Sequence, residues 1–450
     1  MVRPARALIV CVAAVGLGAC DAQAATVSLV PNTEIGEVSF TLRYVAAPGE
    51  ANRLTAVESP DGRVWTFRDA GASVQPGANC AAGADGAIAC TAPATVAAPL
   101  TSYVVADLGD QDDVADVSAA HSGVGDLLAG AGNDRLRTRS GFVNASMGPG
   151  GDVARVDGGQ LAVQGGPGAD RFETGRLGDL QVAYFASARA VRVTTDGRAN
   201  DGAPGEHDNV PRLVQTVSGS AHGDVLDARR SRTRVAIYGG AGDDRAFTAP
   251  RGGFIEGSGG ADVLHGGSGP DGLIGDEGAD VLVGGGGDDD LRGGSGHDLL
   301  VGGSGHDLFH IDNDGRETVR ARDGARDRVI CDWVPYRLRV DRRDRLERCA
   351  FPVAVSAQPP LTSHRRLALV LRCPWAAPGG CRGKLVVFDS RPHPLGRARF
   401  TLAAGAIRRL AVPLSDVPRD LIVSVVVASR RVRPPASQRT TVSGFDLAPL

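Results

Sequence analysis

Six consecutive nonapeptides from Gly257 to His310 follow one pattern, and this stretch determines the fold: GSGGADVLH, GGSGPDGLI, GDEGADVLV, GGGGDDDLR, GGSGHDLLV and GGSGHDLFH. Each begins with Gly, has Gly again at position four, and carries a large apolar residue at position eight. Position six is always aspartate: Asp262, Asp271, Asp280, Asp289, Asp298 and Asp307. A strict period with a constant apolar position argues against a disordered Gly/Asp-rich linker.

A period of nine predicts a flattened coil, in which a glycine-rich bend is followed by a three-residue strand. Two nonapeptides complete one coil, so alternate repeats stack on the same edge, about 4.8 Å apart. The two predicted stacks are Asp262, Asp280 and Asp298, and Asp271, Asp289 and Asp307. We expect Asp280 and Asp289 to lie mid-stack, with Asp262 and Asp307 near the ends.

The charge of this block opposes folding without a counter-ion. It contains 9 Asp and 1 Glu against the single Arg292, and 19 of its 54 residues are Gly. Carboxylates one strand apart repel by about 3 kcal/mol at an effective dielectric of about 20, and glycine-rich backbone loses much entropy when it is ordered. A hard dication bound by carboxylates and carbonyls offsets both costs, and oxygen-only ligands favour Ca²⁺.

The repeat resembles the RTX, or haemolysin-type, calcium-binding family, whose signature is this nonapeptide. The resemblance implies an all-β fold, a parallel β-roll or β-solenoid with small flanking β domains. It also implies several calcium ions, each held between successive bends by the aspartates of position six and by loop carbonyls. Carried over to this chain, the carbonyls come from Gly260, Gly269, Gly278, Gly287, Gly296 and Gly305. Ser258 and Asp276 replace the second glycine, so their bends are less certain.

Degenerate copies of the repeat occur on the N-terminal side of this block. Residues 107–173 form a degenerate roll, and clearer repeats resume at 219 and lead into the block, so we predict a calcium roll over 219–310. The candidate ligands in these copies are Asp134, Asp152, Asp170, Asp224 and Asp244. Calcium at these positions and a metal-free solenoid turn both remain open.

An insert at 174–218 interrupts the period. Its segment 195–209 resembles an oxygen-rich insert of RTX-like exported proteins. It either holds one extra calcium through Asp201, Glu206 and Asp208 or is a plain solvated loop.

The rest of the chain is expected to comprise an export signal (1–25), an N-terminal β domain (26–100), a capping segment (311–358) and a C-terminal β-sandwich (363–450). In the signal, cleavage after residue 24 and a lipid anchor at Cys20 are competing interpretations. Three short-range cysteine couples favour disulfides over a zinc site, because no CxxC spacing occurs. They are Cys80/Cys90, Cys331/Cys349 and Cys373/Cys381.

Sequence motifs of catalysis are absent: there is no G-x-S-x-G elbow, H-E-x-x-H or P-loop. After the signal, no stretch approaches the length of a transmembrane span. We therefore expect a secreted, non-enzymatic protein that folds on binding Ca²⁺ outside the cell, as a surface, matrix or adhesive component. The alternative is an exported, hydrolase-like enzyme that carries an RTX module. Residues 316–450 contain 26 Arg/Lys and 11 Asp/Glu, so a cell-envelope polymer or another polyanion is a candidate partner.

Overall fold

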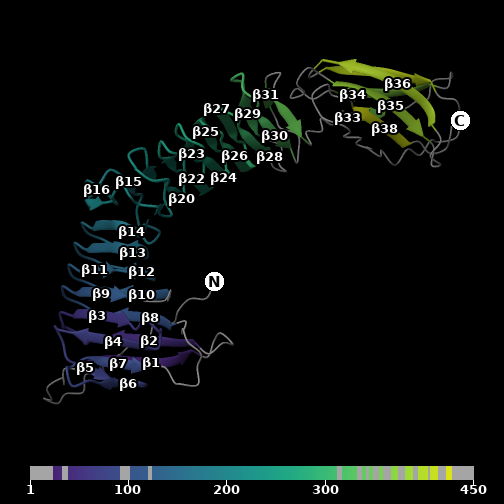
Figure 1. Ribbon diagram of the computed structural model, residues 1–450. Coiled ribbons are helices and arrows are strands. Elements are labelled where there is room, and N and C mark those ends of the chain that lie inside the picture. Colours follow the sequence, from purple (N-terminus) through teal and green to yellow (C-terminus); the bar gives the residue numbers. More distant parts are fainter. Residues whose placement is uncertain are drawn as a thin grey trace, which may run out of the picture.

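The computed structural model describes residues 24–32, 39–91, 102–119, 124–311, 317–331, 337–340, 344–347, 354–357, 366–372, 381–388, 394–403, 406–413 and 422–427. All regular elements in these ranges are β-strands. Most of them wind into a β-solenoid of about 12 turns, which forms an arc ending beside two small sheets (Figure 1). The predicted all-β fold with a parallel β-roll is confirmed. Within the described residues, no helix has the length and apolar character that crossing a membrane requires.

Two parallel sheets form the faces of the roll. One face consists of β15 (Arg192–Thr194), β19 (Val225–Asp227), β21 (Arg245–Phe247), β23 (Val263–His265), β25 (Val281–Gly286), β27 (Leu299–Ser304), β29 (Thr318–Ala321) and β31 (Arg337–Val340). The opposite face consists of β18 (Thr216–Ser218), β20 (Ala236–Ala241), β22 (Phe254–Gly259), β24 (Gly272–Gly278), β26 (Asp290–Gly296), β28 (Leu308–Ile311), β30 (Arg328–Cys331) and β32 (Arg345–Glu347).

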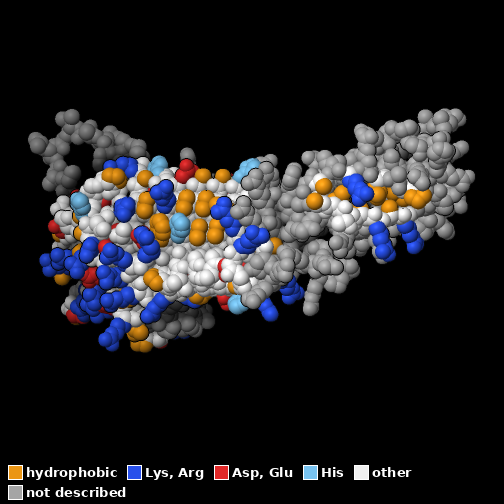
Figure 2. Space-filling view, turned by 90° about the horizontal axis from the view of Figure 1, so that it is seen from above, with side chains coloured by type: hydrophobic (Ala, Val, Ile, Leu, Met, Phe, Trp, Pro, Cys, Tyr) orange, Lys and Arg blue, Asp and Glu red, His pale blue; other side chains and the backbone are white. Residues whose placement is uncertain are grey.

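The residues of position eight form the core of the roll. Leu264 pairs with Leu282, and Leu282 with Leu300, on one face. Their counterparts on the other face, Leu273, Leu291 and Phe309, are stacked in the same way, and all six side chains are fully buried. The flanking residues of each strand point outward, as the two-residue period requires. Seen from above, the molecule shows rows of hydrophobic side chains on its surface, and Lys and Arg side chains gather at the left of the view (Figure 2).

The solenoid covers the residues of the predicted degenerate roll (107–173) and extends beyond the predicted boundaries of both rolls. On the N-terminal side, its strands are β8 (Ser102–Asp107), β9 (Val114–Ser118), β10 (Val124–Leu128), β11 (Arg135–Thr138), β12 (Phe142–Ser146), β13 (Val153–Gln164) and β14 (Arg171–Ala183). Most of 174–218 is also wound into the coil, since β14 pairs with β18. The antiparallel pair of β16 (Ala199–Asp201) and β17 (Asp208–Asn209) interrupts the winding, although Asn209 of β17 also pairs in parallel with Arg171 of β14. The predicted capping segment likewise contains β29–β32, which extend both faces.

The N-terminal strands cap the solenoid. They are β1 (Ala25–Asn32), β2 (Ser39–Val45), β3 (Arg53–Glu58), β4 (Val64–Asp69), β5 (Val74–Pro76), β6 (Cys80–Ala82) and β7 (Ile88–Thr91). Because β2 pairs in parallel with β8 and β3 with β9, this region forms the first coil and does not stand apart as a domain. The antiparallel strands around it cover the open end, which a solenoid must protect. The predicted disulfide Cys80–Cys90 joins β6 and β7.

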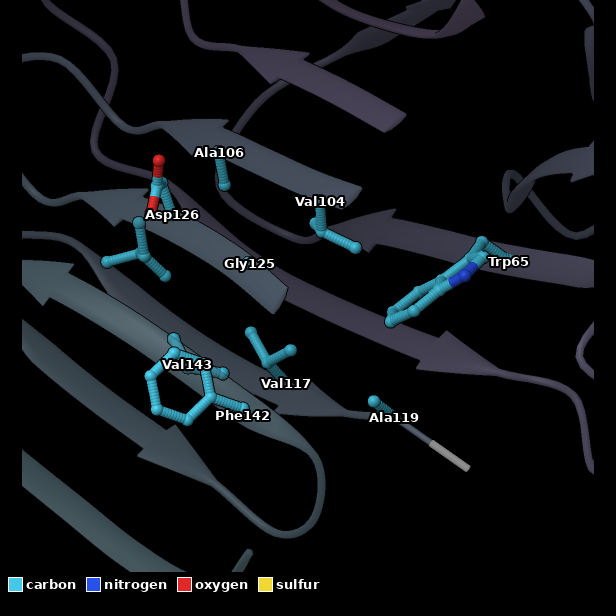
Figure 3. Close-up of a pocket in the computed structure, with 10 residues that line it drawn as sticks. Trp65, Val104, Ala106, Val117, Ala119, Gly125, Asp126, Phe142 and Val143 are labelled. Atoms are coloured by element: carbon cyan, nitrogen blue, oxygen red, sulfur yellow. The ribbon is translucent and has the colours of Figure 1, made fainter. Parts of the chain in front are cut away.

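The buried side chain of Trp65 fills the apolar interior at the N-terminal end of the solenoid. Trp65 of β4 is 2% exposed, and it faces the same apolar interior as Val104, Val117 and Phe142 (Figure 3). The side chains of the antiparallel cap and of the parallel coils therefore share one hydrophobic core.

The described C-terminal strands form two antiparallel three-stranded sheets. One contains β33 (Ala354–Ala357), β34 (Arg366–Arg372) and β37 (Ile407–Pro413), and the other contains β35 (Cys381–Phe388), β36 (Pro394–Leu402) and β38 (Ile422–Val427). Phe400 and Leu402 of β36 and Val412 of β37 are buried. Cys331 is disulfide-bonded, whereas Cys349, Cys373 and Cys20 of the sequence predictions lie outside the described residues.

Candidate calcium centre: the aspartate ladders

The aspartates of position six form hydrogen-bonded ladders along the solenoid axis. Each lies at the end of a bend, with its side chain turned inward, and in Asp262, Asp280, Asp289, Asp298 and Asp307 Oδ1 accepts the backbone N–H of the aspartate one coil earlier. Asp271 differs, because its Oδ2 accepts the N–H of Gly267 and its Oδ1 is buried without a partner. The N···O distances are 2.8 Å for Asp262 to Asp280, 2.9 Å for Asp280 to Asp298, 2.9 Å for Asp271 to Asp289, and 3.1 Å for Asp289 to Asp307. The predicted two stacks thus exist as two ladders, one on each face.

The second carboxylate oxygen of most ladder residues has no partner. Oδ2 of Asp262, Asp280, Asp289 and Asp307 is buried and makes no hydrogen bond, and each of these residues is at most 2% exposed. No described Arg or Lys forms an ion pair with these four carboxylates. A buried, unsatisfied carboxylate oxygen is costly in free energy. Such an oxygen therefore recurs along both ladders, and a dication that binds oxygen ligands would satisfy it.

The pKa values of most of these aspartates are raised, as expected for buried carboxylates with unpaired oxygens. Burial raises the pKa of Asp280 to about 7, and the charges of Asp298 and Asp262 contribute to the rise. Burial likewise raises the pKa of Asp289 to about 7, with contributions from Asp307 and Asp271. The pKa values of Asp262, Asp271 and Asp307 are also raised, chiefly by burial. Without a cation, the folded ladder therefore favours binding protons.

The glycines of position one make room for the free oxygens. A Cβ added to Gly275 would overlap Oδ2 of Asp280 and lie 2.5 Å from the carbonyl oxygen of Gly293. At Gly284, the corresponding oxygens are Oδ2 of Asp289 and the carbonyl oxygen of Gly302, the latter at 2.6 Å. A carboxylate and a carbonyl oxygen therefore converge at the start of each bend. The sequence analysis predicted carbonyl ligands at position four and did not predict this pair of oxygens at position one.

The predicted carbonyl donors of position four lie in two columns along the axis. One column contains Gly260, Gly278 and Gly296, and the other contains Gly269, Gly287 and Gly305. In the first column, the carbonyl oxygen of each glycine faces the α-carbon of the next, which leaves no space for a Cβ. These oxygens lie at the bends, as the predicted ligand set requires.

The two departures from glycine at position two are accommodated with left-handed backbone. Ser258 has φ of 78° and Asp276 has φ of 72°, close to the values of Gly285, Gly294 and Gly303 at equivalent positions. The bends therefore keep their shape, at a conformational cost that glycine would avoid.

The ladders extend past the six predicted residues. Asp244 donates its N–H to Asp262 at 2.8 Å, and Asp307 donates to Asp327 at 3.0 Å. The expectation that Asp262 and Asp307 lie near the ends is therefore wrong. Asp327, in the sequence RDGARDRVI (322–330), was missed because positions one, two and four of the repeat are not glycine there. The spacing from the aspartate to the apolar Val329 is retained, and this is the signal that identifies it.

Asp224 differs from its neighbours. It donates its N–H to Asp244 at 2.7 Å, but its own carboxylate is fully used. Oδ1 accepts the hydroxyl of Ser220 and the N–H of Val191, and Oδ2 accepts the N–H of Ser220. Asp224 thus lacks the free oxygen that marks the other ladder residues, and it is the weakest of the predicted ligands.

A third ladder runs through the N-terminal coils. Asp113, Asp134, Asp152 and Asp170 each donate an N–H to the next aspartate at 2.8 to 2.9 Å, and the last acceptor is Asp208. The Oδ2 atoms of all four are buried without partners. Asn52 occupies the first position, where its N–H donates to Asp113 at 2.6 Å, so the ladder starts with a neutral amide. Asp113 was overlooked because only a weak copy of the repeat, at 108–113, precedes its strand.

No group of three or more His, Cys, Asp or Glu side chains in the described part of the chain converges closely enough to hold a metal ion alone. Ion binding at the ladders would accordingly combine carboxylates with main-chain carbonyls, which is the ligand chemistry that Ca²⁺ accepts. The unpaired Oδ2 atoms and the adjacent carbonyls fit this requirement.

The comparison with protein families agrees with this geometry. The family model of the RTX calcium-binding nonapeptide repeat, in four copies, matches residues 254–273 and 274–309. No curated protein matches the chain significantly. The matched residues coincide with the most regular part of the roll, β22 to β28. The segment from 254 to 309 therefore belongs to the RTX calcium-binding nonapeptide-repeat family.

Proposed function

We propose that this protein is a secreted, non-enzymatic calcium-binding protein whose roll folds when Ca²⁺ binds outside the cell. The observation that carries the proposal is the recurrence of a buried, unpaired carboxylate oxygen in successive nonapeptides, as at Asp280 and Asp289. Calcium supplies positive charge and vacant coordination positions at these oxygens, which offsets the repulsion within each ladder. Binding energy then becomes folding energy.

Export is supported by the family and by the N-terminal sequence. Proteins with RTX repeats are typically secreted. The chain begins with Arg3 and Arg6 followed by the apolar run from Ala7 to Ala19, which is typical of an export signal. Inside the cell, low calcium would leave the roll unfolded and competent for export. Outside, calcium would drive folding in one direction.

A surface or matrix role with a polyanionic partner completes the proposal. Residues 316–450 are rich in arginine, so a cell-envelope polymer is the partner chemistry that fits. Binding of the full chain to isolated cell envelopes, with and without calcium and at rising salt, tests this part. Binding that does not weaken with salt contradicts a polyanionic partner.

The folding claim is tested with the full-length, oxidised protein. Circular dichroism should change from largely disordered to β as calcium rises through about 10⁻⁴ to 10⁻³ M, the range of extracellular modules. After chelation, a protease should cut between Gly257 and His310, while the disulfide-linked segment around Cys80 and Cys90 stays protected. Full β content and uniform protection without calcium would refute calcium-driven folding.

A further inference from the structure

The sheet on the inner side of the arc carries a surface groove (Figure 1). The groove lies over β10, β12, β13, β14 and β18, which pair in parallel, and its volume is about 400 Å³. Volumes of this size are typical of binding sites for small molecules. The groove lies on the outer surface of the coils, whereas the aspartate ladders lie inside them, so the two features are separate.

Two columns of outward-facing side chains form the floor of the groove. Within each column, a residue lies beside its counterpart on the next strand. Alanine and serine recur in both columns, and these small side chains leave the space that forms the depression. One column contains Leu128, Ser146, Gln164, Ala183 and Ser218, and the other contains Asp126, Asn144, Ala162 and Gln181.

The groove carries almost no charge. Among the described residues that line it, Asp126 is the only one with an ionisable side chain. The other halves of β13 and β14, which lie on the opposite face, are highly charged: Arg155 pairs with Glu173 at 3.0 Å, and Arg171 pairs with Glu173 at 2.7 Å. The same strands therefore expose ion pairs on one face and neutral polar groups on the other. The neutral face suits an uncharged ligand.

Amide side chains in the groove are available to such a ligand. Within the described part of the chain, the side chains of Gln164 and Gln181 make no hydrogen bond. Asn144 donates from Nδ2 to Oδ1 of Asp126 at 3.2 Å, and the hydroxyl of Tyr103 donates to the other oxygen of Asp126. An amide both donates and accepts hydrogen bonds, as a hydroxyl group does. These side chains therefore match a ligand rich in hydroxyl groups.

Exposed aromatic rings accompany the amides. Phe185, just after β14, lines the groove and is 63% exposed. Tyr238 of β20 pairs with Ser218 of the groove, is 39% exposed and packs beside Phe254, with ring centroids 5.9 Å apart. The negative face of an aromatic ring attracts the weakly positive C–H groups on the face of a sugar ring. Amides and exposed rings on one neutral surface are the groups that recognise a polysaccharide.

The insert contributes to the same region. Gln164 and Ala183 also line a second cavity, of about 250 Å³, together with Glu206 of the insert. Both oxygens of Asp201 and both of Asp208 accept hydrogen bonds from the chain, which leaves none there for the extra calcium ion that the sequence allowed. Both residues are buried, so the interpretation of the segment as a plain solvated loop is wrong. The insert is thus a fixed wall beside the groove.

We propose that this groove binds an extended, uncharged polysaccharide, whose sugar rings follow the column from Leu128 toward Tyr238. Neighbouring strands lie about 4.8 Å apart, which is close to the advance per ring of an extended β-linked polysaccharide. One ring then contacts each coil, with Gln164 and Gln181 bound to hydroxyl groups and Phe185 stacked on a ring. This inference goes beyond the polyanionic partner proposed above, because it concerns another surface and a ligand without charge.

Calorimetry with the full-length protein in saturating calcium tests the proposal. The probes are cellohexaose, chitohexaose, xylohexaose and mannohexaose, and we expect at least one of them to bind. Phe185→Ala removes the exposed ring and should weaken that binding about tenfold. Ala162→Arg fills the floor of the groove and should abolish it. The matched control is Leu177→Ala, also in β14, whose native side chain is 84% exposed outside the groove, and it should bind as the wild type does.

Two results would overturn the proposal: none of the four probes binds, or Phe185→Ala and Leu177→Ala bind equally well. The Phe185→Ala result decides even if Ala162→Arg does not fold, because the Phe185 ring lies on the surface and circular dichroism can verify the fold of this variant.

Heparin, titrated in parallel, separates this site from the polyanionic partner of the proposed function. Phe185→Ala and Ala162→Arg should bind heparin as the wild type does. Weaker heparin binding by both variants would show that the groove takes polyanions and would overturn an uncharged ligand. If the wild type binds an oligosaccharide but not heparin, the polyanionic partner is refuted and the groove site stands.

Discussion

The backbone N–H of Asp262 donates a 2.8 Å hydrogen bond to the carboxylate of Asp280, which lies 18 residues further along the chain. This bond holds the inward position of the Asp280 side chain and uses one of its two oxygens. The other oxygen is left buried and unpaired. The Asp280 side chain therefore joins two coils through one oxygen and leaves the other oxygen free to bind a cation. A mutation can separate these two roles.

Replacing Asp280 by Asn should have opposite effects with and without calcium. Asparagine retains an oxygen that accepts the N–H of Asp262, but it removes the buried charge. Without calcium at pH 7.5, where the wild-type roll is largely unfolded, we expect Asp280→Asn to raise the residual β content that circular dichroism measures. With saturating calcium, the variant lacks a charged ligand and should lose about 2 kcal/mol of unfolding free energy. Asp290→Asn, at an exposed position of β26, is the control and should change neither value much. A destabilised variant under both conditions would contradict the proposed role of the charge.

The stability of the calcium-free protein should fall as pH rises. The folded-state pKa values of Asp244, Asp280, Asp289 and Asp327 are raised to about 7, chiefly by burial. An unfolded aspartate has a pKa of about 3.9. The native state therefore binds more protons between about pH 4 and 7. Its stability is fully present below this window and is lost as pH rises through it, by about 1.4 kcal/mol per pH unit for each proton bound only when folded.

Urea unfolding in calcium-depleted buffers from pH 4 to pH 8 measures this dependence. Saturating calcium should flatten the curve, because the ion takes the place of the protons. Calcium-free stability that increases from pH 5 to pH 7 would show that the ladder carboxylates are not the dominant titrating groups.

The glycines of position one should tolerate no side chain. Gly275→Ala places a Cβ against Oδ2 of Asp280 and 2.5 Å from the carbonyl oxygen of Gly293. We expect a loss of about 1 to 3 kcal/mol from overpacking and weaker calcium binding by calorimetry. Gly259→Ala is a matched control in the neighbouring repeat, because nothing lies within 4 Å of its added Cβ. If both substitutions lower the stability equally, the glycine at position one is required for its backbone flexibility and not because a Cβ would clash with the neighbouring oxygens.

The non-glycine residue at position two offers a stabilising mutation. Asp276 adopts φ of 72°, a conformation in which glycine avoids a strain of about 1 kcal/mol. Asp276→Gly should therefore raise the free energy of unfolding in calcium by roughly 0.5 to 1 kcal/mol, measured by urea denaturation. Glu277→Gly, at the next position with ordinary backbone, should not stabilise. A less stable Asp276→Gly protein would indicate that the side chain has a role in the roll that outweighs the strain.

The roll was predictable because its evidence is local. A constant apolar residue such as Leu282 and an aspartate such as Asp280, repeated every nine residues, determine the coil, its two faces and its ladders. The N-terminal cap was not predictable as part of the solenoid. The parallel pairing of β2 with β8 joins residues about sixty positions apart, and alternating strands such as Ser39–Val45 suit a separate domain equally well.

The candidate site was predictable only in part, for two physical reasons. Asp208 lies 38 residues from its ladder neighbour Asp170, whereas the other steps from one aspartate to the next span 17 to 21 residues. Because a hairpin intervenes, no sequence period can identify Asp208. The assignment of single oxygens also depends on the fold. Asp224 matches the repeat as well as Asp244 does, yet Ser220 occupies its carboxylate.

All the ladder bonds point in one direction: the earlier coil donates and the later coil accepts. Suppose that the chain emerges from a narrow passage with its N-terminus first. The aspartate N–H of each coil then has no acceptor until the following coil has also emerged. If the C-terminus leads, each new coil meets an acceptor that is already in place outside. The order in which the chain emerges therefore determines whether each new coil pairs at once with a folded coil or remains unpaired until the next one emerges. Asn52 is the neutral first member of the N-terminal ladder, so the growth of that ladder ends there.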